Sequence, residues 1–128
     1  MGLDMYLTAR KFYSSMRDER VIEDGFEVEA KDLHAGYWRK HPDLHGYIVQ
    51  EFNNGVDDCQ PIDLDADCIK KIITAINEGV LPHTGGFFFG KSFGDEKDND
   101  IEILTKALTW LETPEKGVWK SIIYRASW

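Results

Sequence analysis

The chain has 128 residues, of which 42% are hydrophobic and 30% charged, a composition typical of one soluble globular domain spanning residues 1–128. Its net charge of −8 makes it an acidic protein and opposes attraction to phosphate backbones, so we expect no nucleic-acid partner. No apolar run approaches the roughly 18 residues of a spanning helix, and residues 1–7 do not resemble a signal peptide. We therefore expect a cytoplasmic protein that does not enter a membrane.

The first predicted element is a strand over residues 3–9. Its apolar residues alternate with polar ones, which is the pattern of a strand with one buried face. Next, Asp24-Gly25 predicts a hairpin turn between short extended pieces at residues 21–22 and 26–28. The alternating apolar residues are Leu3, Met5, Leu7 and Ala9.

Two helices are predicted in the middle of the chain. Pro42 suits the first position of the first helix, which ends at Asn53-Asn54-Gly55. The second begins near Asp65 and ends at Gly79, a residue that adopts the left-handed cap conformation easily. The apolar face is formed by Leu44, Tyr47, Ile48 and Phe52 in the first helix, and by Ile69, Ile72, Ile73 and Ile76 in the second.

A third helix and a last strand complete the prediction. Asn99, followed by Glu102 three residues later, resembles a capping box, and the helix should end before Pro114. Residues 118–128 are rich in β-formers and predict a strand beside the first one. The fold class is therefore α+β, a small and mostly antiparallel sheet with two or three helices packed on one face. Ile122 and Tyr124 could support a homodimer if exposed, or could lie buried under the helices.

Residues 85–92 match the spacing of a phosphate-binding loop, Gly, four residues, Gly, Lys and Ser. We reject this match because three phenylalanines fill the loop, and because neither a strand before it nor a helix after it is predicted. The run at residues 87–89 fits a buried strand or an aromatic wall at a site, with Phe88 as a binding candidate.

His41 and His45 lie four residues apart and are weak candidates for metal ligands, with Asp57, Asp58, Cys59 and His83 as possible additions. Because the spacing follows no zinc signature, we expect no metal or other cofactor. His41 is expected to cap the helix or to lie in solvent, and His45 to pack against a polar partner.

Asp57-Asp58-Cys59 places two carboxylates beside a thiol. Adjacent side chains of an extended segment point to opposite sides, so the acids do not form a carboxylate dyad. Cys59 could act as a nucleophile only if a histidine, His45 or His83, lay within hydrogen-bond reach, and its structural interpretation is favoured.

Tyr37-Trp38-Arg39-Lys40 combines aromatic surfaces with positive charge in an acidic protein. This pairing suits a planar anionic ligand such as a nucleotide, whose anionic group would bind Arg39. It equally suits a structural role in which Trp38 enters the core and Arg39 pairs with Asp57 or Asp58.

Together, residues 1–7, 37–40, 55–59 and 81–90 resemble the recurring sequence blocks of a family of small uncharacterised proteins from bacteriophages, prophages and bacteria. The blocks read MGLDMYL, YWRK, GVDDC and LPxxGGFFFG. The family has no settled activity, so the resemblance implies no catalytic residues. It implies an accessory protein acting in the host cytoplasm.

Two functions are compatible with these residues. The first is a non-enzymatic binding protein that takes a small anionic ligand or a host protein, with Trp38, Arg39, His45 and Asp58 expected to line a pocket. The second is a small hydrolase or transferase that uses His45 with Asp57 or Asp58, with or without a metal.

Overall fold

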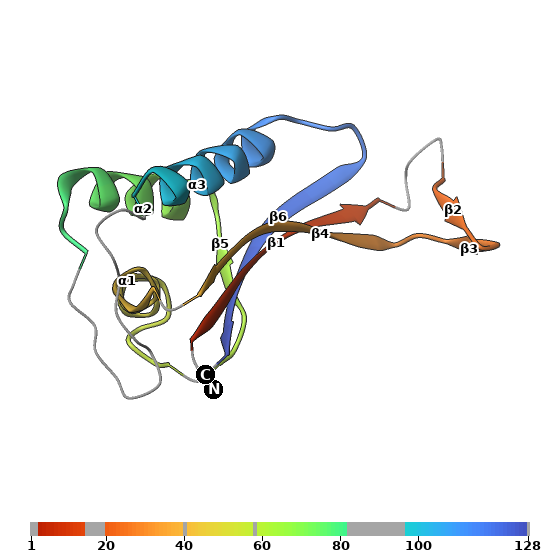
Figure 1. The fold of residues 1–128 in the computed structure, drawn as a ribbon. Helices are drawn as coiled ribbons and strands as arrows, with labels where there is room; N and C mark the ends of the chain where they lie inside the picture. Colours follow the sequence, from red (N-terminus) through yellow and green to blue (C-terminus); the bar gives the residue numbers. More distant parts are fainter. Residues whose placement is uncertain (1–2, 15–19, 40, 58, 82–96, 128) are drawn as a thin grey trace.

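The computed structural model describes residues 3–14, 20–39, 41–57, 59–81 and 97–127. These residues form an α+β fold in which helices cover one face of a sheet (Figure 1). In chain order, the elements are β1 (Asp4–Tyr13), β2 (Ile22–Glu23), β3 (Phe26–Glu27), β4 (Ala30–Arg39), α1 (Pro42–Phe52), β5 (Ile62–Leu64), α2 (Ala66–Glu78), α3 (Lys97–Glu112) and β6 (Val118–Ser127).

The main sheet has four antiparallel strands in the order β4-β1-β6-β5. The first and last strands of the chain pair along their whole length, from Asp4 opposite Ser127 to Tyr13 opposite Val118, as the sequence predicted. β2 and β3 form the predicted hairpin around Asp24-Gly25, which projects from the body of the molecule (Figure 1).

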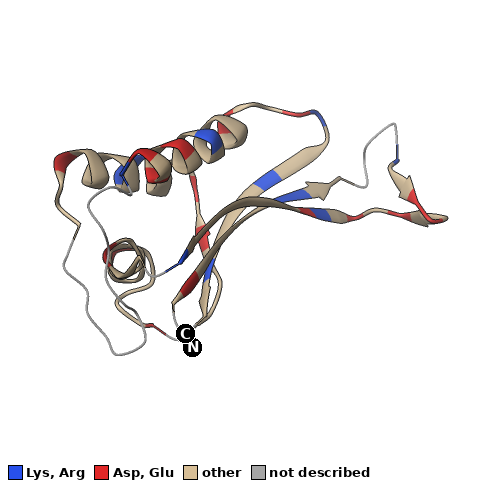
Figure 2. Ribbon diagram, in the orientation of Figure 1, with Lys and Arg blue, Asp and Glu red and all other residues tan. Residues whose placement is uncertain are grey.

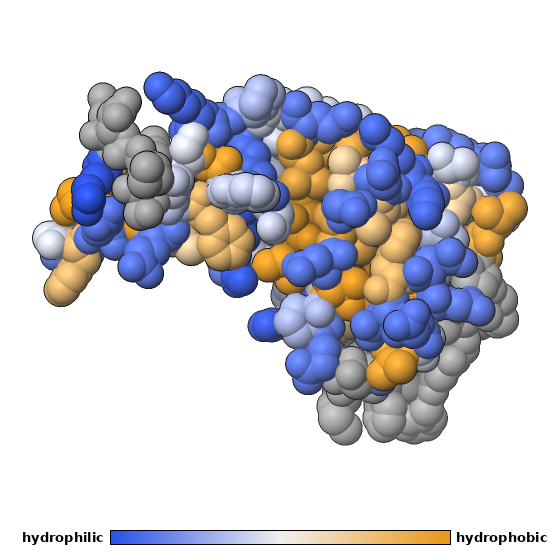
Figure 3. All heavy atoms as spheres, turned by 180° about the vertical axis from the view of Figure 1, so that it is seen from behind, coloured by the Kyte–Doolittle hydropathy of each residue, from blue (hydrophilic) through white to orange (hydrophobic). Residues whose placement is uncertain are grey.

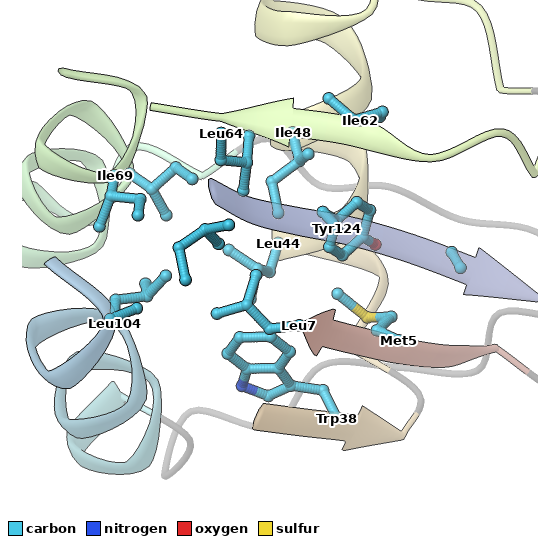
Figure 4. Close-up of a cluster of buried hydrophobic side chains, with 14 of the residues drawn as sticks. Met5, Leu7, Trp38, Leu44, Ile48, Ile62, Leu64, Ile69, Leu104 and Tyr124 are labelled. Atoms are coloured by element: carbon cyan, nitrogen blue, oxygen red, sulfur yellow. The ribbon is translucent and has the colours of Figure 1, made fainter. Parts of the chain in front are cut away.

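The core lies between the sheet and the helices. Alternate residues of β1 point toward the helices and are buried, because a strand presents successive side chains to opposite faces. Side chains from all four strands and all three described helices meet there (Figure 4). The labelled members are Met5, Leu7, Trp38, Leu44, Ile48, Ile62, Leu64, Ile69, Leu104 and Tyr124.

β6 lies between β1 and β5, and the short β5 pairs with residues Ile122, Ile123 and Tyr124 of β6. Ile122 and Tyr124 are each 1% exposed and belong to the core, which excludes them as a dimer surface. Their burial under the helices was the other prediction, and it is correct. In a view from behind, other apolar atoms reach the surface in the body of the molecule, surrounded by hydrophilic residues (Figure 3).

Local signals explain α1 and α2. Pro42 is at the start of α1, and Asn53 ends it, as predicted. The Asp65 carboxylate accepts a hydrogen bond from the backbone N–H of Cys68 at the start of α2, and Gly79 ends α2 with a φ of 67°.

The start of α3 differs from the prediction. The helix begins at Lys97, so Asn99 lies inside its first turn and is not the cap. Asp98 and Asp100 favour this turn because carboxylates are stabilised near a helix N-terminus. Asp100 also anchors the turn by hydrogen bonds to the sheet side of the core.

Charged residues of both signs are mixed over the helices, the strands and the hairpin (Figure 2). The described part of the chain contains no helix that is long and apolar enough to cross a membrane.

Candidate functional site

The sheet separates neighbouring residues of the Tyr37-to-Lys40 segment. Trp38 points into the core and is 5% exposed, whereas Tyr37 and Arg39 point to the other face, which the described helices leave uncovered. We call this uncovered side the open face. Because successive residues of a strand point to opposite faces, Trp38 and Arg39 cannot line one pocket.

Trp38 belongs to a buried polar network. Its indole N–H donates to the Asp100 carboxylate over 2.7 Å, and the His41 Nε2 lies 2.7 Å from the other Asp100 oxygen. All three side chains are almost completely buried. His41 does occupy the N-cap position of α1, as expected, but its side chain makes no capping hydrogen bond and does not lie in solvent; it contacts the buried Asp100 carboxylate instead.

His45 occupies a second buried network. Its Nδ1 is hydrogen-bonded to the Tyr124 hydroxyl, and its Nε2 lies 3.0 Å from both carboxylate oxygens of Asp57. Burial, followed by the negative charge of Asp57, raises the pKa of Tyr124 far above its usual range. The protonated hydroxyl can therefore donate to Nδ1, and Nε2–H then donates to Asp57.

A small hollow opens beside this second network, and its volume of about 10 Å³ is room for about one water molecule. Cys59 and Gln60 line it together with His45, Asp57 and Tyr124. The sequence thus brings His45, Asp57 and Cys59 to one place. Both ring nitrogens of His45 already have partners, so the imidazole offers no free nitrogen to the thiol or to a substrate.

The open face carries the remaining aromatic and cationic candidates. Tyr37 packs against Tyr6 of β1 with ring centroids 5.3 Å apart and the ring planes tilted by 49°, and its hydroxyl donates to Asp4. Tyr6 is also paired in register with Arg125 of β6, so Tyr37, Tyr6 and Arg125 form one row across three strands. Arg39 lies in the next row, opposite Asp4.

We call these five residues, Asp4, Tyr6, Tyr37, Arg39 and Arg125, the open-face cluster. Its rings are accessible, with 39% of Tyr6 and 41% of Tyr37 exposed. Neither arginine forms an ion pair with any residue that the structure describes, so the expected pairing of Arg39 with Asp57 is wrong. The hydrogen bond to Asp4 is the largest cause of a raised pKa for Tyr37, which keeps its hydroxyl neutral.

Three predicted site residues, Lys40, Asp58 and Phe88, lie outside the described residues, as do His83 and the loop at residues 85–92. Within the described ranges, no group of three His, Cys, Asp or Glu side chains could hold a metal ion. His41 and His45 do not converge, since one bonds Asp100 and the other bonds Tyr124 and Asp57.

No protein-family model, curated protein or solved structure matches the chain. The resemblance to small phage and bacterial proteins therefore stays a prediction.

Sequence reasoning missed four residues that matter here: Tyr6, Asp100, Tyr124 and Arg125. For Tyr6 a signal existed, because the alternation of β1 places it on the polar face. Asp100 carried no such signal, since an acid in the first turn of a helix is ordinarily exposed. Pairing Tyr6 with Arg125 requires the register of strands that are more than 100 residues apart in the chain.

Proposed function

We propose that this protein is a non-enzymatic binding protein that holds a small, planar, anionic ligand on the open-face cluster. The observation that carries the proposal is the row of Tyr37, Tyr6 and Arg125 with Arg39 beside it. Two arginines and one aspartate give the cluster one net positive charge within a protein of net charge −8. This local charge complements an anion that the rest of the surface repels.

The chemistry of the cluster supports a ligand that combines a ring with an anion. The exposed tyrosine rings offer faces for stacking, and a guanidinium binds phosphate or carboxylate through two parallel N–H donors. A nucleoside monophosphate has both parts. Its base would stack on the tyrosine rings, and its phosphate would bind the guanidinium group of Arg39 or Arg125.

A titration with AMP, followed by NMR of the backbone amides, tests this function. We expect shifts confined to β1, β4 and β6 and weaker binding of adenosine, which lacks the phosphate. The double variant Arg39→Gln/Arg125→Gln should reduce AMP binding to the level of adenosine, whereas Tyr6→Ala should weaken both ligands.

Arg20→Gln is the matched control, because Arg20 pairs with Glu27 in the hairpin, away from the cluster. It should leave AMP binding unchanged. Equal binding of AMP by the double variant and by the wild type would contradict the proposal. Capture of a host protein on the open face, with no binding of AMP, would replace the small ligand by a protein partner.

The hydrolase or transferase alternative rests on the contact between His45 and Asp57, which does exist. Against it, the imidazole is 2% exposed and has partners at both nitrogens. We therefore favour binding without catalysis.

A further inference from the structure

A groove opens on the other side of the sheet, between α3 and strands β1, β4 and β6. Its volume is about 210 Å³. The sheet contributes Ala9, Leu33, Ala35 and Ile122 to its lining, and α3 contributes Ala107 and Trp110. The groove is therefore mostly apolar and lies apart from the open-face cluster.

Two neighbouring features of β4 create this groove. At Gly36, α3 approaches the strand so closely that an added Cβ would lie 2.5 Å from the Cγ2 of Ile103. Directly before it, the pairing of β1 and β4 shifts register, from Leu7 opposite Gly36 to Thr8 opposite His34. Such a bulge bends and twists a strand. Helix α3 and the sheet are therefore in contact at Gly36. Beyond Gly36 they separate, and the small alanine side chains do not fill the space between them.

A cationic side chain borders the groove. Lys106 of α3 lines it and has no ion-pair partner among the residues that the structure describes. His34 also borders the groove, but its pairing with Thr8 places its side chain on the open face. Lys120 is held close by, since its ammonium donates to the carbonyl oxygens of Trp110 and Thr113 and lies 5.1 Å from the Trp110 ring centroid. An apolar hollow with a free cation at its mouth complements a molecule with an apolar body and one anionic group.

We propose that this groove binds a small amphipathic carboxylate, with its apolar body against the alanines and Trp110 and its carboxylate at Lys106. Size supports this class, because an apolar cavity of about 150 Å³ holds benzene and this groove is somewhat larger. A chain of about eight carbons or a substituted aromatic ring has the corresponding size. This site goes beyond the proposed function and shares no residue with the open-face cluster.

Isothermal titration calorimetry with octanoate, and with octan-1-ol as the uncharged analogue, tests the site. We expect saturable binding of octanoate with a Kd of about 1 mM or below, and binding of the alcohol that is weaker by about threefold to fivefold. In Lys106→Met, the two compounds should bind equally. Lys71→Met, on the exposed surface of α2, is the matched control and should behave like the wild type.

A second variant tests the groove itself. Ala107→Leu adds apolar volume to the lining and should lower octanoate affinity at least tenfold, with circular dichroism to verify folding. Absence of saturable octanoate binding to the wild type would overturn the proposal, as would equal affinity for octanoate and octan-1-ol. If sedimentation showed a dimer that excludes octanoate, the occupant would be a second copy and the carboxylate site would be rejected. None of these results depends on AMP binding.

Discussion

The indole N–H of Trp38 donates a 2.7 Å hydrogen bond to the buried carboxylate of Asp100, joining β4 to the first turn of α3. The two residues are separated by 62 positions in the chain. The Nε2 of His41 contacts the second carboxylate oxygen of Asp100, so this one carboxylate is the hydrogen-bond partner of two buried ring nitrogens. This contact fixes the start of α3 over the end of β4, and Gly36 lies two residues before Trp38.

Asp100→Ala should destabilise the protein by about 2–5 kcal/mol, because it leaves the buried nitrogens of Trp38 and His41 without their acceptor. Asp100→Asn should cost less, since its carbonyl oxygen can still accept from Trp38. Urea unfolding measures both. Asp98→Ala, exposed in the same turn, is the control and should cost less than about 1 kcal/mol. Equal losses for Asp98→Ala and Asp100→Ala would show that the buried network is unimportant.

Gly36→Ala should destabilise the protein by about 1–3 kcal/mol, because the new methyl group would overlap with the Ile103 side chain at 2.5 Å. The double variant Gly36→Ala/Ile103→Ala tests the cause. Removing Ile103 makes room for the methyl group, so the double variant should lose less stability than the sum of the two single variants. Additive losses would exclude this contact as the reason for glycine at position 36.

Tyr124 should make the protein sensitive to alkali. Burial raises the pKa of its hydroxyl, so above the ordinary tyrosine pKa of about 10 the unfolded chain loses a proton that the folded protein keeps. The free energy of unfolding should be unaffected by this group below about pH 10 and should fall as the pH rises further. Tyr124→Phe should show a shallower fall between about pH 10 and 11.5. Identical slopes for Tyr124→Phe and the wild type would refute the assignment.

Asp65→Ala should cost about 1 kcal/mol at pH 7, because the α2 cap loses the acceptor for the Cys68 backbone N–H. That hydrogen bond lowers the pKa of Asp65, so ionisation of the cap adds to the stability at neutral pH, and this charge-dependent part is lost as the pH falls through the lowered pKa. Thermal unfolding at pH 7 and at about pH 2.5 should therefore show a larger difference between the variant and the wild type at pH 7. Asp65→Asn, which keeps an acceptor, should remain close to the wild type.

Local patterns in the sequence were sufficient for the three helices, the hairpin turn and the two terminal strands, whereas β4 and β5 were not predicted. The alternation in residues 3–9, the turn at Asp24-Gly25 and the caps at Asp65 and Gly79 act through neighbouring residues, so they can be recognised without a structure. The capping signal at Asn99 was misleading, because α3 begins at Lys97 and Asn99 lies inside its first turn.

The sequence predicted only some of the residues of the candidate site. The Tyr37-to-Lys40 segment stood out by composition, and the strand period then separates Trp38 from Tyr37 and Arg39. The partners of Tyr37 could not be predicted, because they depend on the register of β4, β1 and β6. A shift of one residue in that register would move Tyr6 to the core face.

The sequence by itself determined the class of fold, the helices, the two terminal strands and most of the buried faces, since these follow from periodicity and local capping chemistry. The tertiary structure decided which buried polar groups find hydrogen-bond partners and which aromatic rings remain exposed. It also decided where α3 and the sheet separate. Those properties depend on strand order and packing between residues far apart in the chain, as in the pairing of Tyr6 with Arg125 and the bulge beside Gly36.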